Sequence, residues 1–348
     1  MYHPRFKGKH YDIGLKFGGI LKKQNVDFNQ IIHLTEFQED FGRKSQVILA
    51  EVFPEISDEI RGVTEGLNFP YEKFASWLLC MGCCLHDLGC TAFCYENKGN
   101  IIYGRNNDLP PQLKKVSQSV FYQLERSYSF VGNTSGMINL EEGINEKGLA
   151  VAMTFVLPLT VQPGLSSVFL VRYLLEKCET TESASKALES LPIASACNII
   201  LADQKGDMVV AECIPGKVNV RTPEKGENFI VAANHFTSDG MKVHEIGNRD
   251  EYYSEERYET ACNALLNGKS KDGTVYAMEI LSGKYGFMCQ YPKSSGCDTI
   301  WSSVFDITNR RIFRAEGNPK RSRFKEDERL WKVRKGMRSN SESLSFSQ

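Results

Sequence analysis

The first 88 residues carry apolar positions at helical spacing. Ile56, Ile60 and Val63 are separated by four and three residues, which predicts a helix with one buried face. Pro54 suits the first turn of that helix, and Gly66 stands where a C-terminal cap is expected. A second apolar helical face follows, made of Tyr71, Phe74, Trp77 and Leu78.

From residue 90 the pattern changes to short apolar runs separated by turns that contain Gly and Asn. The turn 97–100 separates expected strands at 91–96 and 101–105, and the turn 145–148 precedes a strand at 149–156. The remaining strands are expected at 198–202, 208–213 and 229–234, with a last hairpin formed by 299–307 and 311–315. Helices are expected at 168–191, 255–266 and 275–281.

Antiparallel strands that alternate with pairs of helices favour two sheets packed face to face between helical layers. We therefore predict an α+β fold, a four-layer αββα sandwich with antiparallel sheets and an N-terminal helical leader. The change of pattern divides the chain into a leader, 1–89, and a core, 90–333. The Ser-rich, basic stretch 334–348 has no periodicity and is expected to be disordered.

Composition favours a globular protein that acts on small molecules. Hydrophobic residues make up 41% of the chain, and 42 basic residues nearly balance 43 acidic ones, so no strong field favours nucleic acid or an anionic membrane as a partner. The first residues lack the apolar run of a signal peptide, and no later run approaches the roughly 18 residues of a membrane span. We therefore expect a cytoplasmic location.

Eleven cysteines are an odd number in a chain without an export signal, so a disulfide framework is not expected. Cys80, Cys83, Cys84 and His86 could supply half of a zinc site, but no second Cys pair or His pair completes it. Spacings of three and four also describe one buried helical stripe, and a position late in a helix does not favour a reactive thiol. We expect no metal and no cofactor.

Candidate chemistry gathers on the first hairpin of the core. If the turn 97–100 pairs Glu96 with Ile101, the same register brings Asn107 opposite Cys90. Arg105 and Asp108 then return to the end of the sheet at which Cys90 lies. The register therefore predicts that a thiol, a guanidinium and a carboxylate converge.

Such a cluster suits a cysteine nucleophile that supplies its own base. A cysteine attacks as the thiolate, and its ordinary pKa of about 8.5 leaves little thiolate at neutral pH. Cleavage after Gly89 would free the α-amine of Cys90, with a pKa of about 8, to accept the thiol proton. Asp108 could orient that amine, and Arg105 could lower the pKa of the thiol or hold a substrate oxygen. Gly89 lets the thiol approach the preceding carbonyl, because it has no side chain.

These motifs together resemble the choloylglycine hydrolase and penicillin acyltransferase superfamily of N-terminal-nucleophile (Ntn) hydrolases. Three further motifs carry the resemblance: Asn145-Glu146-Lys147-Gly148-Leu149, Ala233-Asn234-His235-Phe236, and Thr299 to Asp306 followed by Gly317-Asn318-Pro319. The helical leader is similar to the acyl-CoA:6-aminopenicillanic acid acyltransferase branch, peptidase family C45, whose internal Gly-Cys bond is cut autocatalytically.

The resemblance implies a role for each candidate residue. Cys90 is the nucleophile, Arg105 and Asp108 assist it, and Asn234 donates to the oxyanion hole, where one donor is typically worth roughly 100- to 1000-fold in rate. Further candidates for oxyanion or substrate contact are Asn107, Thr154 and His235. Two departures from the family pattern stand out: Thr154 occupies the place of an oxyanion Asn of the bile-salt hydrolases, and 299–305 offers no counterpart to their second Arg.

The expected function is hydrolysis or transfer of the acyl group of a small linear amide through a Cys90 thioester. The expected partners are a small-molecule amide or acyl donor and the chain's own N-terminal fragment, in a heterodimer; a homo-oligomer stays open. Two alternatives remain at this point. One is a papain-like protease that uses Cys90 and His235, and the other is a non-catalytic binding protein whose chain stays uncut.

Overall fold

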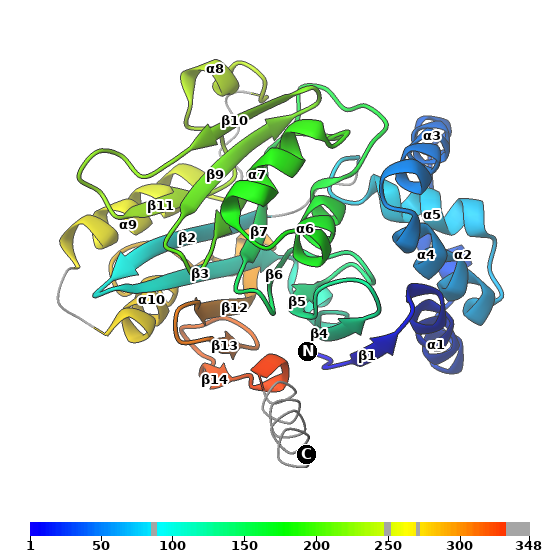
Figure 1. Cartoon of the computed structure of the whole chain (residues 1–348), viewed down its shortest axis with the longest axis horizontal. Helices are drawn as coiled ribbons and strands as arrows, with labels where there is room; N and C mark the ends of the chain where they lie inside the picture. Colours follow the sequence, from blue (N-terminus) through cyan, green and yellow to red (C-terminus); the bar gives the residue numbers. More distant parts are fainter. Residues whose placement is uncertain (85–88, 247–251, 269–271, 332–348) are drawn as a thin grey trace, which may run out of the picture.

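The computed structural model describes residues 1–84, 89–246, 252–268 and 272–331. The tail 334–348 and His86 lie outside the described residues, so the predictions made for them stay predictions. Two sheets lie face to face at the centre of the molecule, and the N-terminal helices gather at one side of them (Figure 1).

The leader is helical, as its periodicity predicts, but it also contributes a strand. β1 (Arg5–Gly8) pairs in parallel with a strand of the core, which the sequence analysis did not predict. α4 continues past Gly66, and Asn68, with φ of 60°, caps it; the expectation that Gly66 is the cap was therefore wrong. The leader helices are α1 (His10–Lys23), α2 (Phe28–Ile31), α3 (Glu36–Val52), α4 (Pro54–Leu67) and α5 (Tyr71–Cys80).

Gly66 has a packing role instead. A Cβ added to Gly66 would lie 2.5 Å from the carbonyl oxygen of Leu15, and one added to Gly18 would lie 2.1 Å from that of Val63. α1 and α4 therefore touch backbone to backbone, which only glycine permits.

The larger sheet has eight strands in the order β1-β4-β5-β6-β7-β8-β9-β10. All neighbours are antiparallel except β1 and β4. Its core strands are β4 (Gln118–Leu124), β5 (Phe130–Thr134), β6 (Glu142–Asn145), β7 (Ala150–Phe155), β8 (Cys197–Ala202), β9 (Met208–Ile214) and β10 (Lys217–Arg221).

The smaller sheet has six antiparallel strands in the order β11-β2-β3-β12-β13-β14. Its central hairpin turns through Lys98 and Gly99, whose φ angles of 53° and 81° suit a tight turn. Its strands are β2 (Gly89–Asn97), β3 (Asn100–Leu109), β11 (Phe229–Ala232), β12 (Asp298–Asp306), β13 (Arg311–Ala315) and β14 (Lys325–Glu326).

Helices cover the outer faces of both sheets and complete four layers (Figure 1). α6 (Ser167–Lys177) and α7 (Thr181–Ser190) lie on the larger sheet, while α9 (Ser254–Asn267) and α10 (Gly273–Leu281) lie on the smaller one. α8 (Asp239–Lys242) is a single short turn. Between the sheets pack apolar side chains from both, among them Ala92, Tyr103, Ile144, Ala152, Ile200, Val210 and Phe305. The predicted αββα sandwich is confirmed.

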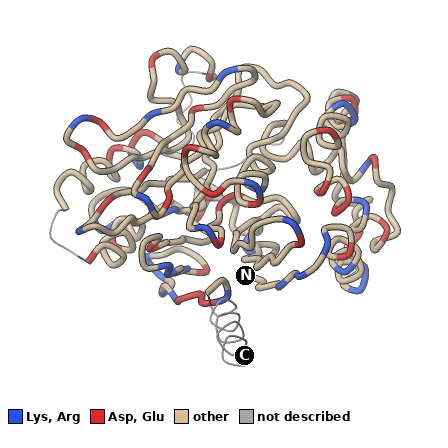
Figure 2. Tube along the Cα trace, viewed as in Figure 1, with Lys and Arg blue, Asp and Glu red and all other residues tan. Residues whose placement is uncertain are grey.

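Charge is spread over the molecule without a face of one sign in this view (Figure 2). None of the helices in the described part of the chain is both long and apolar enough to cross a membrane. A cytoplasmic location stays a prediction.

Candidate active site

Cys90 is the second residue of β2, at the centre of the smaller sheet. The register pairs Glu96 with Ile101 and Cys90 with Asn107, as predicted from the turn. Gly89 pairs with Asp108, so the residue before Cys90 and the candidate carboxylate lie opposite one another. The side chain of Cys90 is fully buried.

The sulfur of Cys90 has two polar partners on β3. Arg105 Nη2 donates a hydrogen bond to Sγ at 2.9 Å, and the thiol donates to Asn107 Oδ1 at 3.4 Å. Burial raises the pKa of the Cys90 thiol to about 12, although Arg105 acts in the opposite direction. Arg105 thus favours the thiolate as expected, but in this continuous chain burial outweighs it and the sulfur is a thiol at neutral pH.

The backbone nitrogen of Cys90 is held from another strand. It donates to Asn234 Oδ1 at 2.9 Å, and Asn234 is the second residue after β11. The amide nitrogen of Asn234 donates to the carbonyl oxygen of Phe155 at 2.8 Å. In this structure Asn234 therefore orients the nitrogen of Cys90, while its role as an oxyanion donor stays a prediction.

Arg257 completes the site and was missed by the sequence analysis. Its Nη1 donates to the carbonyl oxygen of Cys90 at 2.6 Å, and its Nη2 donates to Asn234 Oδ1 at 2.7 Å. The signal was present in the pattern of α9, where Arg257 occupies the buried stripe with Thr260, Ala261, Ala264 and Leu265. A charged residue in an apolar stripe needs a buried partner, which makes it a candidate for a site.

Asp108 lies next to this arginine. Its Oδ2 is 3.7 Å from Arg257 Nη1 and accepts from the Tyr291 hydroxyl at 3.0 Å, while Oδ1 accepts from Thr299 Oγ1. Burial raises the pKa of Asp108, and Arg257 with the two hydroxyls opposes that effect. Asp108 is therefore linked to Cys90 indirectly: Arg257 lies beside the carboxylate and donates to the Cys90 carbonyl oxygen, and the backbone of Asp108 pairs with that of Gly89.

Two of the predicted site residues, Thr154 and His235, make their hydrogen bonds with other residues. Thr154 Oγ1 donates to the carbonyl oxygen of Ala233 and accepts from Asn198 Nδ2 at 3.1 Å. His235 Nδ1 lies 2.7 Å from Ser254 Oγ, and its ring packs edge-on against Tyr258. The structure brings Arg105, Asn107 and Asn234 onto Cys90, but it places neither Thr154 nor His235 against the sulfur.

Gly89 is required at its position by packing. A Cβ at residue 89 would lie 2.8 Å from Cδ2 of the Tyr252 ring and 3.1 Å from the carbonyl oxygen of Asp108. Tyr252 and Tyr253 both have positive φ, 53° and 58°, which is costly for aromatic residues and fixes the ring beside the Gly89–Cys90 bond.

A metal centre finds no support in the described part of the chain, where no three His, Cys, Asp or Glu side chains are grouped to hold an ion. Cys80 and Cys83 are buried at the end of the leader, packed with Phe41 and Ala194. α5 ends at Cys80, so Cys83 and Cys84 lie in the turn that follows the helix, and the predicted single helical stripe was wrong.

A four-layer αββα sandwich with a cysteine at the start of a central strand defines the N-terminal-nucleophile hydrolase fold. The family described as acyl-coenzyme A:6-aminopenicillanic acid acyl-transferase matches residues 94–321, more than half of the chain. The chain belongs to this family. The match begins after Cys90, so it does not cover the Gly89–Cys90 bond.

Known relatives agree with this placement. Penicillin V acylase from Pectobacterium atrosepticum is 25% identical over 194 residues, which cover 44% of this chain and 51% of that protein. The chain thus spans about half the length of this curated relative. Two solved structures of conjugated bile acid hydrolase variants from Clostridium perfringens each share 14% identity, with TM-scores of 0.52, and cover 68% of this chain and 92% of theirs. At this identity they support the fold.

Proposed function

We propose that the chain is an amide hydrolase or acyltransferase that activates itself by cleavage between Gly89 and Cys90 and then uses Cys90 as its nucleophile. One observation carries the proposal: both reactive ends of Cys90 are held, the sulfur by Arg105 at 2.9 Å and the backbone nitrogen by Asn234 at 2.9 Å. An N-terminal nucleophile needs a sulfur and an amine fixed in this way.

Activation follows from the position of the thiol. The thiol of Cys90 loses its proton to solvent and Sγ attacks the carbonyl carbon of Gly89; the peptide nitrogen then takes a proton from solvent and leaves as a free amine. A thioester then joins Gly89 to the sulfur. Water hydrolyses it, which leaves a carboxylate on Gly89 and restores the thiol.

Turnover uses the amine that activation sets free. The amine accepts the thiol proton, the thiolate attacks the substrate carbonyl, and the ammonium returns the proton to the leaving nitrogen. Arg105 stabilises the thiolate, while Asn234 and Arg257 hold the amine and the backbone of Cys90. The acyl-enzyme passes its acyl group to water or to an acceptor amine.

Cleavage would leave a leader fragment that shares a core with the catalytic fragment. Ile60 and Val63 of α4 lie in one apolar cluster with Val151, Phe169 and Leu174 of the core. We therefore include a retained leader in the proposal, as a heterodimer of the two fragments that acts on a small-molecule amide or acyl donor.

Purified protein should run as two fragments of 89 and 259 residues, and N-terminal sequencing of the larger should begin Cys-Thr-Ala-Phe. Cys90→Ala should give an uncut chain without amidase activity, because it removes the attacking sulfur. Cys262→Ala, which removes a half-buried thiol on α9, is the matched control and should be cut normally. An active enzyme with an intact bond before residue 90 would refute the mechanism, and an inert uncut chain would favour a binding protein.

A further inference from the structure

Four buried polar atoms beside Cys90 have no hydrogen-bond partner. Three are donors, Nε and Nη1 of Arg105 and Nδ2 of Asn107, and the fourth is an acceptor, Oε2 of Glu141. A buried polar atom without a hydrogen bond is unfavourable, so a group of four beside one nucleophile indicates a place where a ligand binds.

Glu141 is held so that one oxygen is used and the other is free. Its Oε1 accepts from the backbone nitrogen of Ser135 at 2.8 Å and from the Ser135 hydroxyl at 2.6 Å. Its Oε2 lies 3.8 Å from Arg105 Nη2, the same nitrogen that donates to Cys90 Sγ. The side chain is 3% exposed, and burial raises its pKa. The charge of Arg105 and hydrogen-bonding groups of Ser135 and Asn107 oppose that effect.

The neighbouring Glu142 shows what a structural carboxylate looks like in this fold. Its two oxygens accept from side chains of four different residues, Tyr103, Asn133, Trp301 and Ser303. Glu141 differs because Oε2 faces the Arg105 guanidinium at 3.8 Å and the Asn107 amide without a completed hydrogen bond to either. Compensation of the Arg105 charge explains why a carboxylate is present there, but it does not explain an oxygen that completes no hydrogen bond.

A secondary amide has the matching pattern of groups. Its carbonyl oxygen accepts hydrogen bonds, as the free donors of Arg105 and Asn107 require, and its N–H supplies the one donor that Glu141 lacks. An ester or a tertiary amide has the carbonyl oxygen but no N–H. The peptide nitrogen of Cys90 does not need Glu141, because it already donates to Asn234.

We propose that Glu141 binds substrate, with Oε2 accepting the hydrogen bond from the N–H of the scissile amide, so that the mature enzyme selects secondary amides. This inference rests on the proposed amidase function of Cys90. When the C–N bond breaks, the leaving nitrogen takes its proton from the Cys90 ammonium, and Glu141 stays a carboxylate that pairs with the departing amine.

The variant Glu141→Gln tests this contact. The backbone nitrogen of Ser135 needs an acceptor, so the glutamine oxygen takes the place of Oε1 and its NH2 group faces the substrate N–H. Two hydrogen-bond donors, the glutamine NH2 group and the substrate N–H, then face each other without an acceptor. We expect kcat/KM for the anilide of the best acyl group to fall roughly 10- to 100-fold, while that for the phenyl ester of the same acid changes little.

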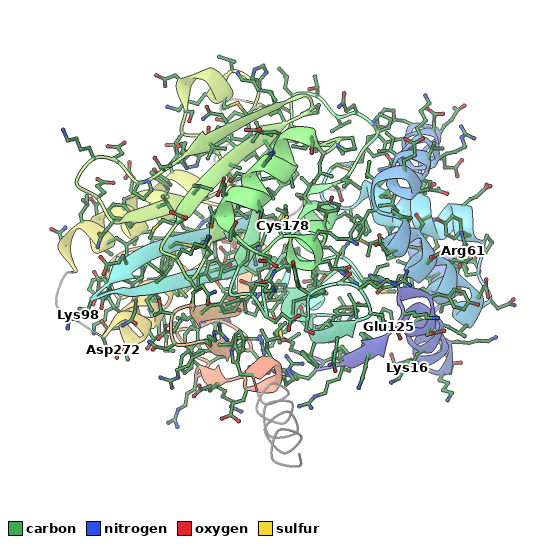
Figure 3. All side chains as sticks on the ribbon, in the orientation of Figure 1. Lys16, Arg61, Lys98, Glu125, Cys178 and Asp272 are labelled. Carbon is green, nitrogen blue, oxygen red and sulfur yellow. The ribbon has the colours of Figure 1, made fainter. Side chains whose placement is uncertain are left out.

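Controls separate this role from a structural one. Glu125→Gln removes an exposed carboxylate at the edge of the core (Figure 3) and should leave both substrates unaffected. Complete cleavage after Gly89 in Glu141→Gln would show that the fold is intact. The wild type alone gives a second test, since it should cleave the anilide well and the N-methylanilide at least tenfold more slowly.

Two results would overturn the inference: equal loss on anilide and ester in Glu141→Gln, or equal rates of the wild type on anilide and N-methylanilide. Failure of the proposed function would look different, because the wild type would then stay uncut or cleave none of the three substrates.

Discussion

Cys90 is surrounded by groups that act on its ionisation in opposite directions. Burial raises the pKa of the thiol to about 12; Arg105 and Arg257 lower it, and Glu141 and Asp108 raise it. In the continuous chain the thiol is therefore protonated near neutral pH, and only a free amine on the same residue would bring a base into contact. The setting therefore suits the proposed mechanism, in which Cys90 would become fully reactive only after cleavage.

This difference predicts two pH profiles. Well below a pKa of about 12, the fraction of Cys90 present as thiolate grows tenfold for each unit of pH. The cleavage rate should therefore climb steadily from pH 6 to pH 9. Activity of the mature enzyme should instead level off once the amine, with a reference pKa of about 8, is neutral. Cell-free translation at several pH values, with fragments followed by electrophoresis, gives the first profile. A flat cleavage profile would show that solvent deprotonation of the thiol is not required.

Closeness to Cys90 along the chain decided which residues of the site could be predicted from the sequence. Arg105 and Asn107 lie on the strand next to Cys90, joined by a four-residue turn, so register alone placed them. Arg257 comes from a helix 167 residues away, and its contact with Cys90 depends on how α9 packs on the sheet. Glu141 was missed for the same reason, because it directly precedes β6, a strand of the other sheet.

Among the elements, the contact between α1 and α4 is the most tightly specified. Gly14 and Gly18 of α1 and Gly62 and Gly66 of α4 would all place an added Cβ within 2.5 Å of backbone atoms of the other helix. Gly19 lies beside them, and a Cβ there meets nothing within 4 Å. Neighbouring glycines in one helix thus differ in their roles.

Substitution of these two glycines should have opposite effects on stability. Gly18→Ala forces α1 away from α4 and should lower the free energy of unfolding by about 1–3 kcal/mol, whereas Gly19→Ala should leave it unchanged or raise it by about 0.5–1 kcal/mol through helix propensity. Urea unfolding followed by circular dichroism measures both. Equal effects of the two substitutions would contradict the close helix contact.

Strands that are bounded by Gly- and Asn-containing turns were predictable, whereas short edge strands without such turns were not. Gly and Asn turns marked β2, β3 and β7, and their bounds agree with expectation within a few residues. β1 and β10 have four and five residues with little apolar content, and they are strands because they add to the edges of an existing sheet. A partner supplied by the tertiary fold leaves no local signal.

Across the whole molecule, a buried charge network ties the leader to the core. Arg172 of α6 donates to Glu59 of α4 at 2.7 Å and to Glu176 at 2.5 Å, and Glu176 lies 2.9 Å from the ring of His10 in α1. All four side chains are buried. Although burial acts to raise the pKa of Glu176, Arg172 and His10 outweigh it and lower the value to about 2.

These contacts predict how firmly the two fragments would stay together after the proposed cleavage. Arg172→Met would leave two buried carboxylates without their cation, a loss worth about 3–5 kcal/mol, and should release the leader at urea concentrations that the wild type tolerates. Arg61→Met removes an exposed partner of Asp58 on α4 (Figure 3) and should have little effect. Size-exclusion chromatography of the processed protein distinguishes the two variants. Retention of the leader by Arg172→Met at the same urea concentration as the wild type would contradict the role of the network.

The same network sets the pH range of the association. Because the pKa of Glu176 is about 2 in the folded protein and about 4.3 in an unfolded chain, its contribution is complete above the unfolded value and is lost as pH falls toward the folded one. The fragments should therefore elute together near neutral pH and separate progressively between about pH 4 and pH 2. In Arg172→Met the cation that lowers this pKa is absent, so separation should begin at higher pH. A separation midpoint that does not shift in this variant would place the retention of the leader in the apolar contacts and the β1–β4 pair alone.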